Sequence, residues 1–324
     1  MNRIALIIPY FGTLPNYFSL WLKTASYNRN FDFLLFTDCN LAKCTVPYNV
    51  KCFQMTFDEV KQRVSTILNF KFVLHNPYKL CDYKPLYGLI FSDYLKEYEF
   101  WGHCDPDIIW GNLSAYITDG ILSRYDRLYR RGHLCIYRNV PEINQAAITL
   151  PQKGKISYKD VYRHKYIAHY DEGTLLETLV QQQGGKLWEE DDFADISYFH
   201  KQFVLVKHNR LCETVAAFRW KNGKLTGIGI DGDLNKEQEY SYIHLQKRKM
   251  SYVEKLSDDF IITPTGFIPY TDFWKEMAVE WLKPDPAFEK RAQLNNRKNQ
   301  IKNVKEGALI FRFKNKLWEG GMRP

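Results

Sequence analysis

Hydrophobic residues in the first third of the chain occur in short continuous runs that turn residues separate. Arg3 to Tyr10 (RIALIIPY) is one such run, and Phe31 to Asp38 (FDFLLFTD) is a second. Residues 98–104 (YEFWGHC) form another, and a shorter strand is predicted at 50–54. Runs of this length are typical of strands that are buried on both faces of a parallel sheet.

Helical patterns separate these strands. Residues 16–27 place apolar side chains on one face of a predicted helix. Residues 56–59 (TFDE) form a capping box that begins a second helix, and a third is predicted at about 82–96. This order predicts an α/β fold whose mostly parallel, Rossmann-like sheet is flanked by helices.

The second part of the chain contains shorter strand-like runs, at 132–139, 198–209, 223–230 and 240–246. A helix is predicted at about 270–282, and the sequence KPDP then interrupts the pattern. We therefore expect one domain over residues 1–284, with halves 1–112 and 113–284, followed by a separate tail, 285–324.

In parallel sheets, ligands bind beyond the carboxyl ends of the strands. The sequence WGHCDPDIIWGN places Asp105 and Asp107 directly after a predicted strand, and Pro106 between them ends strand pairing. Both carboxylates can then reach one point, which predicts a Mg²⁺ or Mn²⁺ site shared with a substrate phosphate. Within the strand, His103 points to the same side as Asp105. A solvated Asp-Pro-Asp turn is the alternative interpretation.

A third metal ligand is available in the segment IHLQKRK. His244 follows a strand-like run, and a neutral imidazole can complete a metal site. Lys247 or Arg248 could then hold the outer oxygens of a diphosphate. The alternative is that His244 is an ordinary structural histidine.

The catalytic base is less well defined by the sequence. An inverting sugar transfer needs a carboxylate that takes the proton of the acceptor hydroxyl. The segment AHYDEGT offers Asp171 and Glu172, which we favour. The acidic run LWEEDDFAD offers alternatives, chiefly Asp191 and Asp192 but also Asp195. A retaining reaction would require no such base.

Composition narrows the class of protein. The chain has 324 residues and 45% hydrophobic content, and it contains no apolar run of about 18 residues, so no membrane span is predicted. Its N-terminal apolar run lacks a small-residue cleavage site, which favours a buried strand over a signal peptide. Seven cysteines without zinc-site spacing indicate reduced thiols in a cytoplasmic protein.

The net charge of +8 is concentrated at the C-terminus, where residues 283–324 hold eleven Lys or Arg and four Asp or Glu. Apolar residues recur among these cations, from Leu294, Ile301 and Val304 to Leu317 and Trp318. This pattern is typical of an interfacial anchor on anionic lipid. It would place the protein peripherally at the inner face of the cell membrane. A packed helix pair or a solvated end is an equal alternative.

The chain resembles glycosyltransferases of the GT-A type, which use a nucleotide-sugar donor and a divalent metal. The resemblance covers residues 3–250 and rests on IALIIPY, on FTD and on CDYKPLYGLIFSDYLKEYEFWGHCDPD. Asp82 and Lys84 stand where the family has an Asp and an Arg before its DxD motif, although their spacing differs. More closely, the chain resembles glycosyltransferase-like proteins encoded among bacterial capsule and lipopolysaccharide genes.

The resemblance implies a GT-A-like fold in which residues 1–112 bind the nucleotide and residues 113–284 bind the acceptor. Asp38 and the loop formed by Pro9, Tyr10, Phe11 and Gly12 would contact the nucleoside. The expected reaction moves a hexose, such as galactose or galactofuranose, from a UDP-sugar to a glycan or lipid-linked acceptor.

Three rival classes remain at this point. A metal-dependent phosphoesterase or nuclease also uses paired aspartates. A nucleic-acid-binding protein would explain the basic tail, but the rest of the chain is nearly neutral, so we expect no nucleic-acid partner. A non-catalytic carbohydrate-binding protein would explain the aromatic residues but not the acids at the strand ends.

Overall fold

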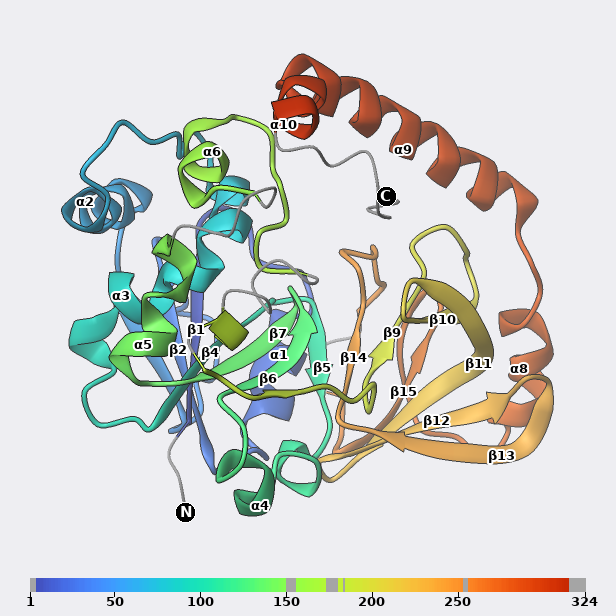
Figure 1. The fold of residues 1–324 in the computed structure, drawn as a ribbon. Helices are drawn as coiled ribbons and strands as arrows, with labels where there is room; N and C mark the ends of the chain where they lie inside the picture. The colour runs from blue at the N-terminus through green and yellow to red at the C-terminus, as the bar shows by residue number, and fades with distance from the viewer. Residues whose placement is uncertain (1–3, 150–155, 173–179, 183, 253–255, 315–324) are drawn as a thin grey trace.

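A computed structural model describes residues 4–149, 156–172, 180–182, 184–252 and 256–314. Within these residues the strands form three sheets, and helices cover the first of them (Figure 1). The first sheet has the order β3-β2-β1-β4-β7-β6-β8. Its strands are β1 (Ile4–Tyr10), β2 (Phe31–Thr37), β3 (Val50–Gln54), β4 (Phe100–Cys104), β6 (Arg127–Arg131), β7 (Leu134–Arg138) and β8 (Leu187–Trp188).

The centre of this sheet follows from the continuous apolar runs. In β1, Ala5 and Ile7 face one core cluster, while Ile4, Leu6 and Ile8 face the opposite one. A strand that is apolar at every position can be buried on both faces, and β1 lies between β2 and β4 as a parallel neighbour of each. The predicted strands at 31–38, 50–54 and 98–104 are confirmed as β2, β3 and β4, and the one at 3–10 is confirmed over its described residues, Ile4–Tyr10.

The sheet is mixed, because β7 runs antiparallel to both β4 and β6. Gly102 permits the close approach of β4 and β7, since a Cβ atom there would lie 2.4 Å from the carbonyl oxygen of Cys135. This pairing places the turn at Gly132–His133 beside Asp105, whose amide donates to the carbonyl oxygen of His133 (3.1 Å).

The second sheet is antiparallel, with the order β13-β12-β11-β15-β16 and β10 paired to β11. The third is small, with the order β5-β14-β9. The second comprises β10 (Phe203–Lys207), β11 (Arg210–Lys221), β12 (Lys224–Ile230), β13 (Asp233–Tyr240), β15 (Asp259–Thr263) and β16 (Gly266–Pro269). The third comprises β5 (Ile108–Trp110), β9 (Ala194–Asp195) and β14 (Tyr242–His244).

The prediction of a mostly parallel, Rossmann-like sheet flanked by helices is therefore wrong. The described strands lie in one mixed, one antiparallel and one small mixed sheet. The alternation of apolar strands and helices holds only for about the first 104 residues, and the prediction assumed it for the whole chain. Long hairpins such as β11–β12 and β12–β13 replace helical crossovers in the second part.

Most helices pack against the first sheet. The capping box of α2 is confirmed, with Thr56 and Glu59 each bonding the other's backbone. The predicted helix at 82–96 is instead a series of short turns, η1, α3 and η2, because Pro85 interrupts it. The helical elements of this region are α1 (Phe18–Ala25), α2 (Phe57–Ile67), η1 (Pro77–Leu86), α3 (Tyr87–Ile90), η2 (Ser92–Tyr94), η3 (Leu113–Ala115), α4 (Asp119–Leu122), α5 (Pro141–Asn144), η4 (Ala146–Ile148) and α6 (Tyr158–Arg163).

The last described segment, residues 256–314, contains three helices: α8 (Trp274–Trp281), α9 (Pro286–Lys305) and α10 (Ala308–Lys314). In Figure 1, α9 crosses the top of the molecule from α8, beside the second sheet, to α10, near α6. Ala308 and Phe311 of α10 are buried in one core cluster of the first sheet. No helix in the described ranges is long and apolar enough to cross a bilayer.

Candidate metal centre

Asp105 and Asp107 follow β4 and precede β5. The side chain of Asp107 is 5% exposed and that of Asp105 is 28% exposed, so the pair lies at the boundary between interior and solvent. The indole nitrogen of Trp21 donates to the carbonyl oxygen of Asp105 (3.3 Å), which helps to fix this turn. The turn thus presents one buried and one accessible carboxylate.

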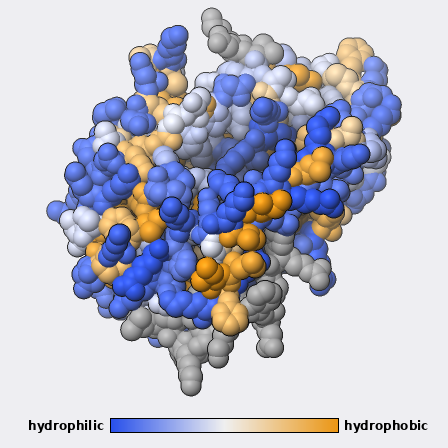
Figure 2. Space-filling model, turned by 90° about the horizontal axis from the view of Figure 1, so that it is seen from above, coloured by the Kyte–Doolittle hydropathy of each residue, from blue (hydrophilic) through white to orange (hydrophobic). Residues whose placement is uncertain are grey.

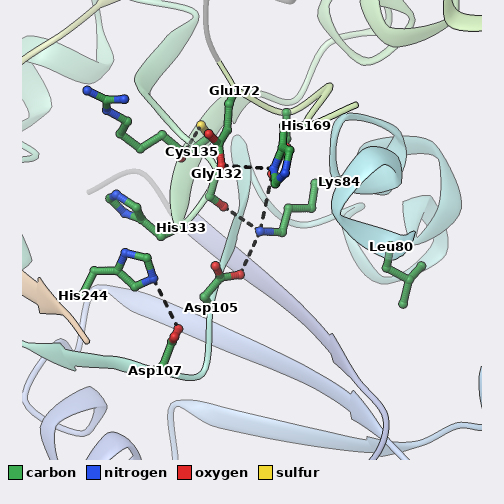
Figure 3. Close-up of polar contacts among 12 residues, drawn as sticks. Leu80, Lys84, Asp105, Asp107, Gly132, His133, Cys135, His169, Glu172 and His244 are labelled. Carbon is green, nitrogen blue, oxygen red and sulfur yellow. Dashed lines mark hydrogen bonds and ion pairs between the residues drawn. The ribbon is translucent and has the colours of Figure 1, made fainter. Parts of the chain in front are cut away.

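The third sheet brings His244 to the same place. β14 pairs antiparallel with β5, and His244 is opposite Ile108 in that register. Its Nε2 atom consequently lies 3.5 Å from Oδ1 of Asp107. Asp105, Asp107 and His244 can each offer one ligand atom, and these atoms all lie within 4.8 Å of one another. The structure therefore brings together the three residues predicted as metal ligands (Figure 3).

Asp195 orients the imidazole of His244. It lies on β9, which pairs with β14 so that Asp195 is opposite His244. Its Oδ1 atom is 2.9 Å from Nδ1 of His244 and accepts a hydrogen bond from the side chain of Gln246 (2.7 Å). With Nδ1 engaged, Nε2 faces Asp107, as is common for histidine ligands with an outer carboxylate. In the sequence, Asp195 was only one member of an acidic run.

The charges at this centre are consistent with a cation. Burial alone would lower the pKa of His244, but Asp107 and Asp195 raise it to about 10. Burial alone would raise the pKa of Asp107, but His244 and the amide of Lys247 hold it well below its usual range. The protonated imidazole thus places one positive charge between the two carboxylates, where a metal ion would also bring positive charge. Two carboxylates and one imidazole are ligand types that divalent metal ions use in proteins.

His133 is a polar residue of this centre that the sequence did not indicate. Its ring centroid lies 4.4 Å from that of His244, and its Nδ1 atom is 3.0 Å from the hydroxyl of Tyr242. Its buried Nε2 atom has no hydrogen-bond partner among the described residues. Burial and the charge of His244 lower the pKa of His133 to about 4, so the ring is neutral at pH 7. His133, Asp195 and His244 form a second group that could hold a metal.

Lys84 connects the metal centre with a second acidic group. Its ammonium donates to Oδ1 of Asp105 (2.8 Å) and to the carbonyl oxygen of Gly132 (2.7 Å), and it lies 3.5 Å from Asp171. Although burial opposes protonation, Asp105 and Asp171 raise the pKa of Lys84 well above its usual value. Lys84 is thus a fixed cation between the two sites (Figure 3).

Asp171 and Glu172, the two residues favoured as candidate base, lie side by side against Gly132. A Cβ atom at Gly132 would lie 2.5 Å from Oδ2 of Asp171 and 2.6 Å from Oε1 of Glu172, so a larger residue there would displace both carboxylates. Asp171 is buried, and burial raises its pKa to about 7. The Glu172 side chain is 44% exposed, and His169 and Lys84 lower its pKa to about 2 against the effect of burial. The alternatives are engaged elsewhere: Asp192 with Tyr129 and Ser241, and Asp191 with His208.

Lys247 is at the metal centre, whereas Arg248 has a structural role. The backbone amide of Lys247 donates to Asp107 (2.6 Å), and its ammonium lies 3.8 Å from the ring centroid of Tyr78. The guanidinium of Arg248 donates to the carbonyl oxygens of Ser197, His200, Lys201 and Pro264. It is therefore not available to a diphosphate.

Asp82 and His103 were also predicted to contact the donor, but both are buried inside the protein. Asp82 forms a buried ion pair with Lys79 (2.6 Å) and accepts hydrogen bonds from the amides of Ala168 and Tyr170. It therefore positions the segment that leads to Asp171. His103 is fully buried near the rings of Tyr87 and Tyr137, beneath the site, and burial lowers its pKa well below its usual value.

The loop after β1 lies beside the loop after β2. The carbonyl oxygen of Gly12 accepts a hydrogen bond from Sγ of Cys39, which follows the exposed Asp38. Tyr10 bonds the carbonyl oxygen of Thr13, and burial together with the charges of Cys39 and Asp107 raises its pKa. Pro9 lies within β1, and Phe11 packs on Phe57.

The chain belongs to a family of unknown function (DUF6625), whose model matches residues 6–271. The match includes Lys84, Asp105, Asp107, Asp195 and His244, and it ends before α8. No curated protein matches the chain.

Proposed function

We propose that this protein is a metal-dependent glycosyltransferase that moves a hexose from a UDP-sugar to a hydroxyl group of a glycan or lipid-linked acceptor. The observation that carries the proposal is the convergence of Asp105, Asp107 and His244 from distant parts of the chain. One of these ligands is accessible, and a lysine lies beside the group. Such a site suits a cation that is shared with a substrate diphosphate.

The donor would bind between the metal centre and the β1 loop. Bound there, Mn²⁺ or Mg²⁺ would neutralise the departing diphosphate. Lys247 adds a cation at the same place, and Tyr78, which is 51% exposed, offers a ring face to the base or sugar. Lys84 holds Asp105 in position, and Asp195 does the same for His244.

We assign the general base to Glu172. A base must reach the acceptor hydroxyl, and Glu172 is half exposed whereas Asp171 is buried behind it. His169 lies 3.8 Å from Glu172 and orients it, and Glu172 and Asp171 raise the pKa of His169 to about 9 against the effect of burial. Asp171 is a positioning residue that acts through Lys84. This arrangement favours an inverting reaction.

The test has two steps on the full chain. Thermal-shift titrations would compare UDP, GDP and ADP with and without Mn²⁺, because a ligand that binds the folded state raises its stability. Nucleotide sugars would then be incubated with glycan and lipid-linked acceptors, and products would be identified by mass spectrometry. We expect Mn²⁺-dependent binding of UDP and transfer of the sugar. Absence of nucleotide binding with any metal would overturn the proposal.

A metal-dependent phosphoesterase is the second candidate, because His133, Asp195 and His244 form a second ligand group that shares His244. Paired ligand groups of this kind also occur in two-metal hydrolases. The same incubation separates the two functions. Release of phosphate from model phosphoesters without transfer of a sugar would favour hydrolysis.

A further inference from the structure

Helix α9 lies on the outside of the molecule along its whole length. Its 20 residues, Pro286–Lys305, correspond to about 30 Å, and none of them is buried. Both ends are attached to the body. Asp285 caps the helix and lies 3.7 Å from Lys201, while Phe311 of α10 packs on the rings of His164 and Tyr166. The helix is therefore a fixed element and not a free tail.

Polar and apolar residues are distributed on α9 in the opposite way to a helix that packs its apolar face on a protein. Phe288, in the first turn, is partly covered and lies near Arg248 (6.0 Å from guanidinium carbon to ring centroid). The other α9 positions that the body partly covers form one helical stripe of polar and small residues, namely Glu289, Ala292, Asn296, Asn303 and Glu306. After the first turn, the large apolar residues point outward instead: Leu294, Ile301 and Val304 are 47%, 59% and 47% exposed. A surface helix of a globular protein normally places its apolar residues on the covered side.

Basic residues share this outer face. At 100° per residue they lie within about 80° of Leu294 on either side, and all of them are exposed. They are Lys290, Arg291, Arg297, Lys298, Lys302 and Lys305. Over residues 285–314, eight Lys or Arg and three Asp or Glu leave a net charge of +5.

The apolar surface continues onto α10. Its residues Leu309, Ile310 and Phe313 are exposed, whereas Ala308 and Phe311 on the other side are buried. Seen from above, the apolar residues alternate with hydrophilic ones along one ridge (Figure 2). We call this surface the α9–α10 ridge: Leu294, Ile301, Val304, Leu309, Ile310 and Phe313, with the six basic residues of α9.

We propose that the α9–α10 ridge docks the protein onto an anionic lipid bilayer. A bilayer interface accepts both parts of the ridge, since apolar side chains enter the acyl boundary while lysine and arginine reach the anionic headgroups. The helix can enter this region because its amides and carbonyls bond within the helix. The charge of the ridge is complementary to the surface. An acidic protein or nucleic acid would use the cations but leave the protruding apolar residues exposed. The inference does not depend on the proposed transfer reaction.

The test is co-sedimentation of the full chain with vesicles of phosphatidylcholine alone or mixed with phosphatidylglycerol, at low and high salt. We expect binding to the mixed vesicles at low salt, with an affinity at least about tenfold above that for neutral vesicles. High salt should weaken it. Residues 315–324, including Leu317 and Trp318, lie outside the described residues, so the variants are confined to α9 and α10.

Two multiple-substitution variants separate the contribution of apolar contact to vesicle binding from that of charge. Ile310→Ser with Phe313→Ser removes apolar contact, and Arg297→Gln with Lys298→Gln and Lys302→Gln removes charge. We expect each to reduce binding at least about tenfold. The matched control, Tyr48→Ser with Leu211→Ser, removes exposed apolar residues elsewhere and should bind normally. Absence of vesicle binding by the full chain would overturn the proposal. Full vesicle binding by the variant with Ile310→Ser and Phe313→Ser would also overturn it, because the cations alone would then suffice, as they would for an acidic partner. Concentration-dependent dimerisation that this variant abolishes would instead assign the ridge to a second copy.

Discussion

The backbone amide of Lys247 donates a 2.6 Å hydrogen bond to Oδ2 of Asp107, although 140 residues separate the two in the chain. Gln246 and Lys247 both have positive φ angles, 51° and 55°, which non-glycine residues seldom adopt. Each such residue costs about 1–3 kcal/mol and is typical of functional sites. The turn after β14 therefore holds a strained conformation that directs the Lys247 amide toward the same buried carboxylate that His244 faces.

Asp107→Asn is expected to remove metal-dependent UDP binding while the protein remains folded. The asparagine keeps a side-chain oxygen that can accept the Lys247 amide but loses the charge that a metal requires. We expect Mn²⁺ affinity, measured by calorimetry, to fall at least about 100-fold, because loss of an outer-sphere partner alone costs 10–100-fold. Asp105→Asn should behave similarly. Asp258→Asn, at a surface ion pair with Lys23, is the matched control. Normal Mn²⁺ binding by Asp107→Asn would contradict the metal assignment.

Metal affinity is expected to rise with pH. His244 must be neutral to bind a metal, but its pKa in the metal-free protein is raised to about 10. Below that value a proton competes with the metal, so affinity should increase by about tenfold per pH unit. Calorimetry between about pH 6 and 8 would measure the slope, and buffers of different ionisation enthalpy would detect the released proton. In His244→Asn the slope should be much smaller.

Asp195→Asn tests the outer carboxylate. An asparagine cannot stabilise a charged imidazole and can reverse the orientation of the ring, so Mn²⁺ affinity should fall by about 10–100-fold. The pH profile of metal binding distinguishes an outer carboxylate from a residue that is only structural. Without Asp195 the pKa of His244 should be lower, and the pH dependence of metal binding should weaken above the lower pKa. A change in unfolding temperature with unaltered metal binding would show that Asp195 is only structural.

The sequence predicted the central strands because apolar residues at successive positions leave little choice but a buried strand. It also placed Asp105, Asp107 and His244 together, since each follows a strand-like run. The antiparallel second sheet was missed, although its signals are present. Asn222-Gly223 and Asp231-Gly232 all have positive φ, as two-residue hairpin turns require, and they join β11 to β12 and β12 to β13.

Other parts of the site depend on contacts that no local pattern encodes. Arg248 and Asp82 have the residue types of a ligand site, yet both satisfy backbone groups of the protein. Conversely, His133 and Asp195 reach the metal centre only through the pairing of β7 with β4 and of β9 with β14. Tertiary pairing, rather than residue type, decides which polar side chains meet.

The last prediction concerns stability and a carboxyl group that the proposed reaction does not use. Burial raises the pKa of Asp192 to about 6, although hydrogen bonds from Ser241 and Tyr129 oppose the shift. In the unfolded chain its pKa is about 3.9. The folded state therefore binds this proton more tightly, and the resulting stability is fully present below about pH 4 and lost as the pH rises through about 6. Asp192→Asn retains a neutral acceptor, so above pH 6 it should exceed the wild type in free energy of unfolding by up to about 3 kcal/mol. The difference should vanish near pH 4. Urea unfolding across this pH range would measure the difference in free energy of unfolding between the variant and the wild type. If the variant instead lost stability relative to the wild type as the pH rose from 4 to 7, Asp192 would act as a charged partner in the folded state.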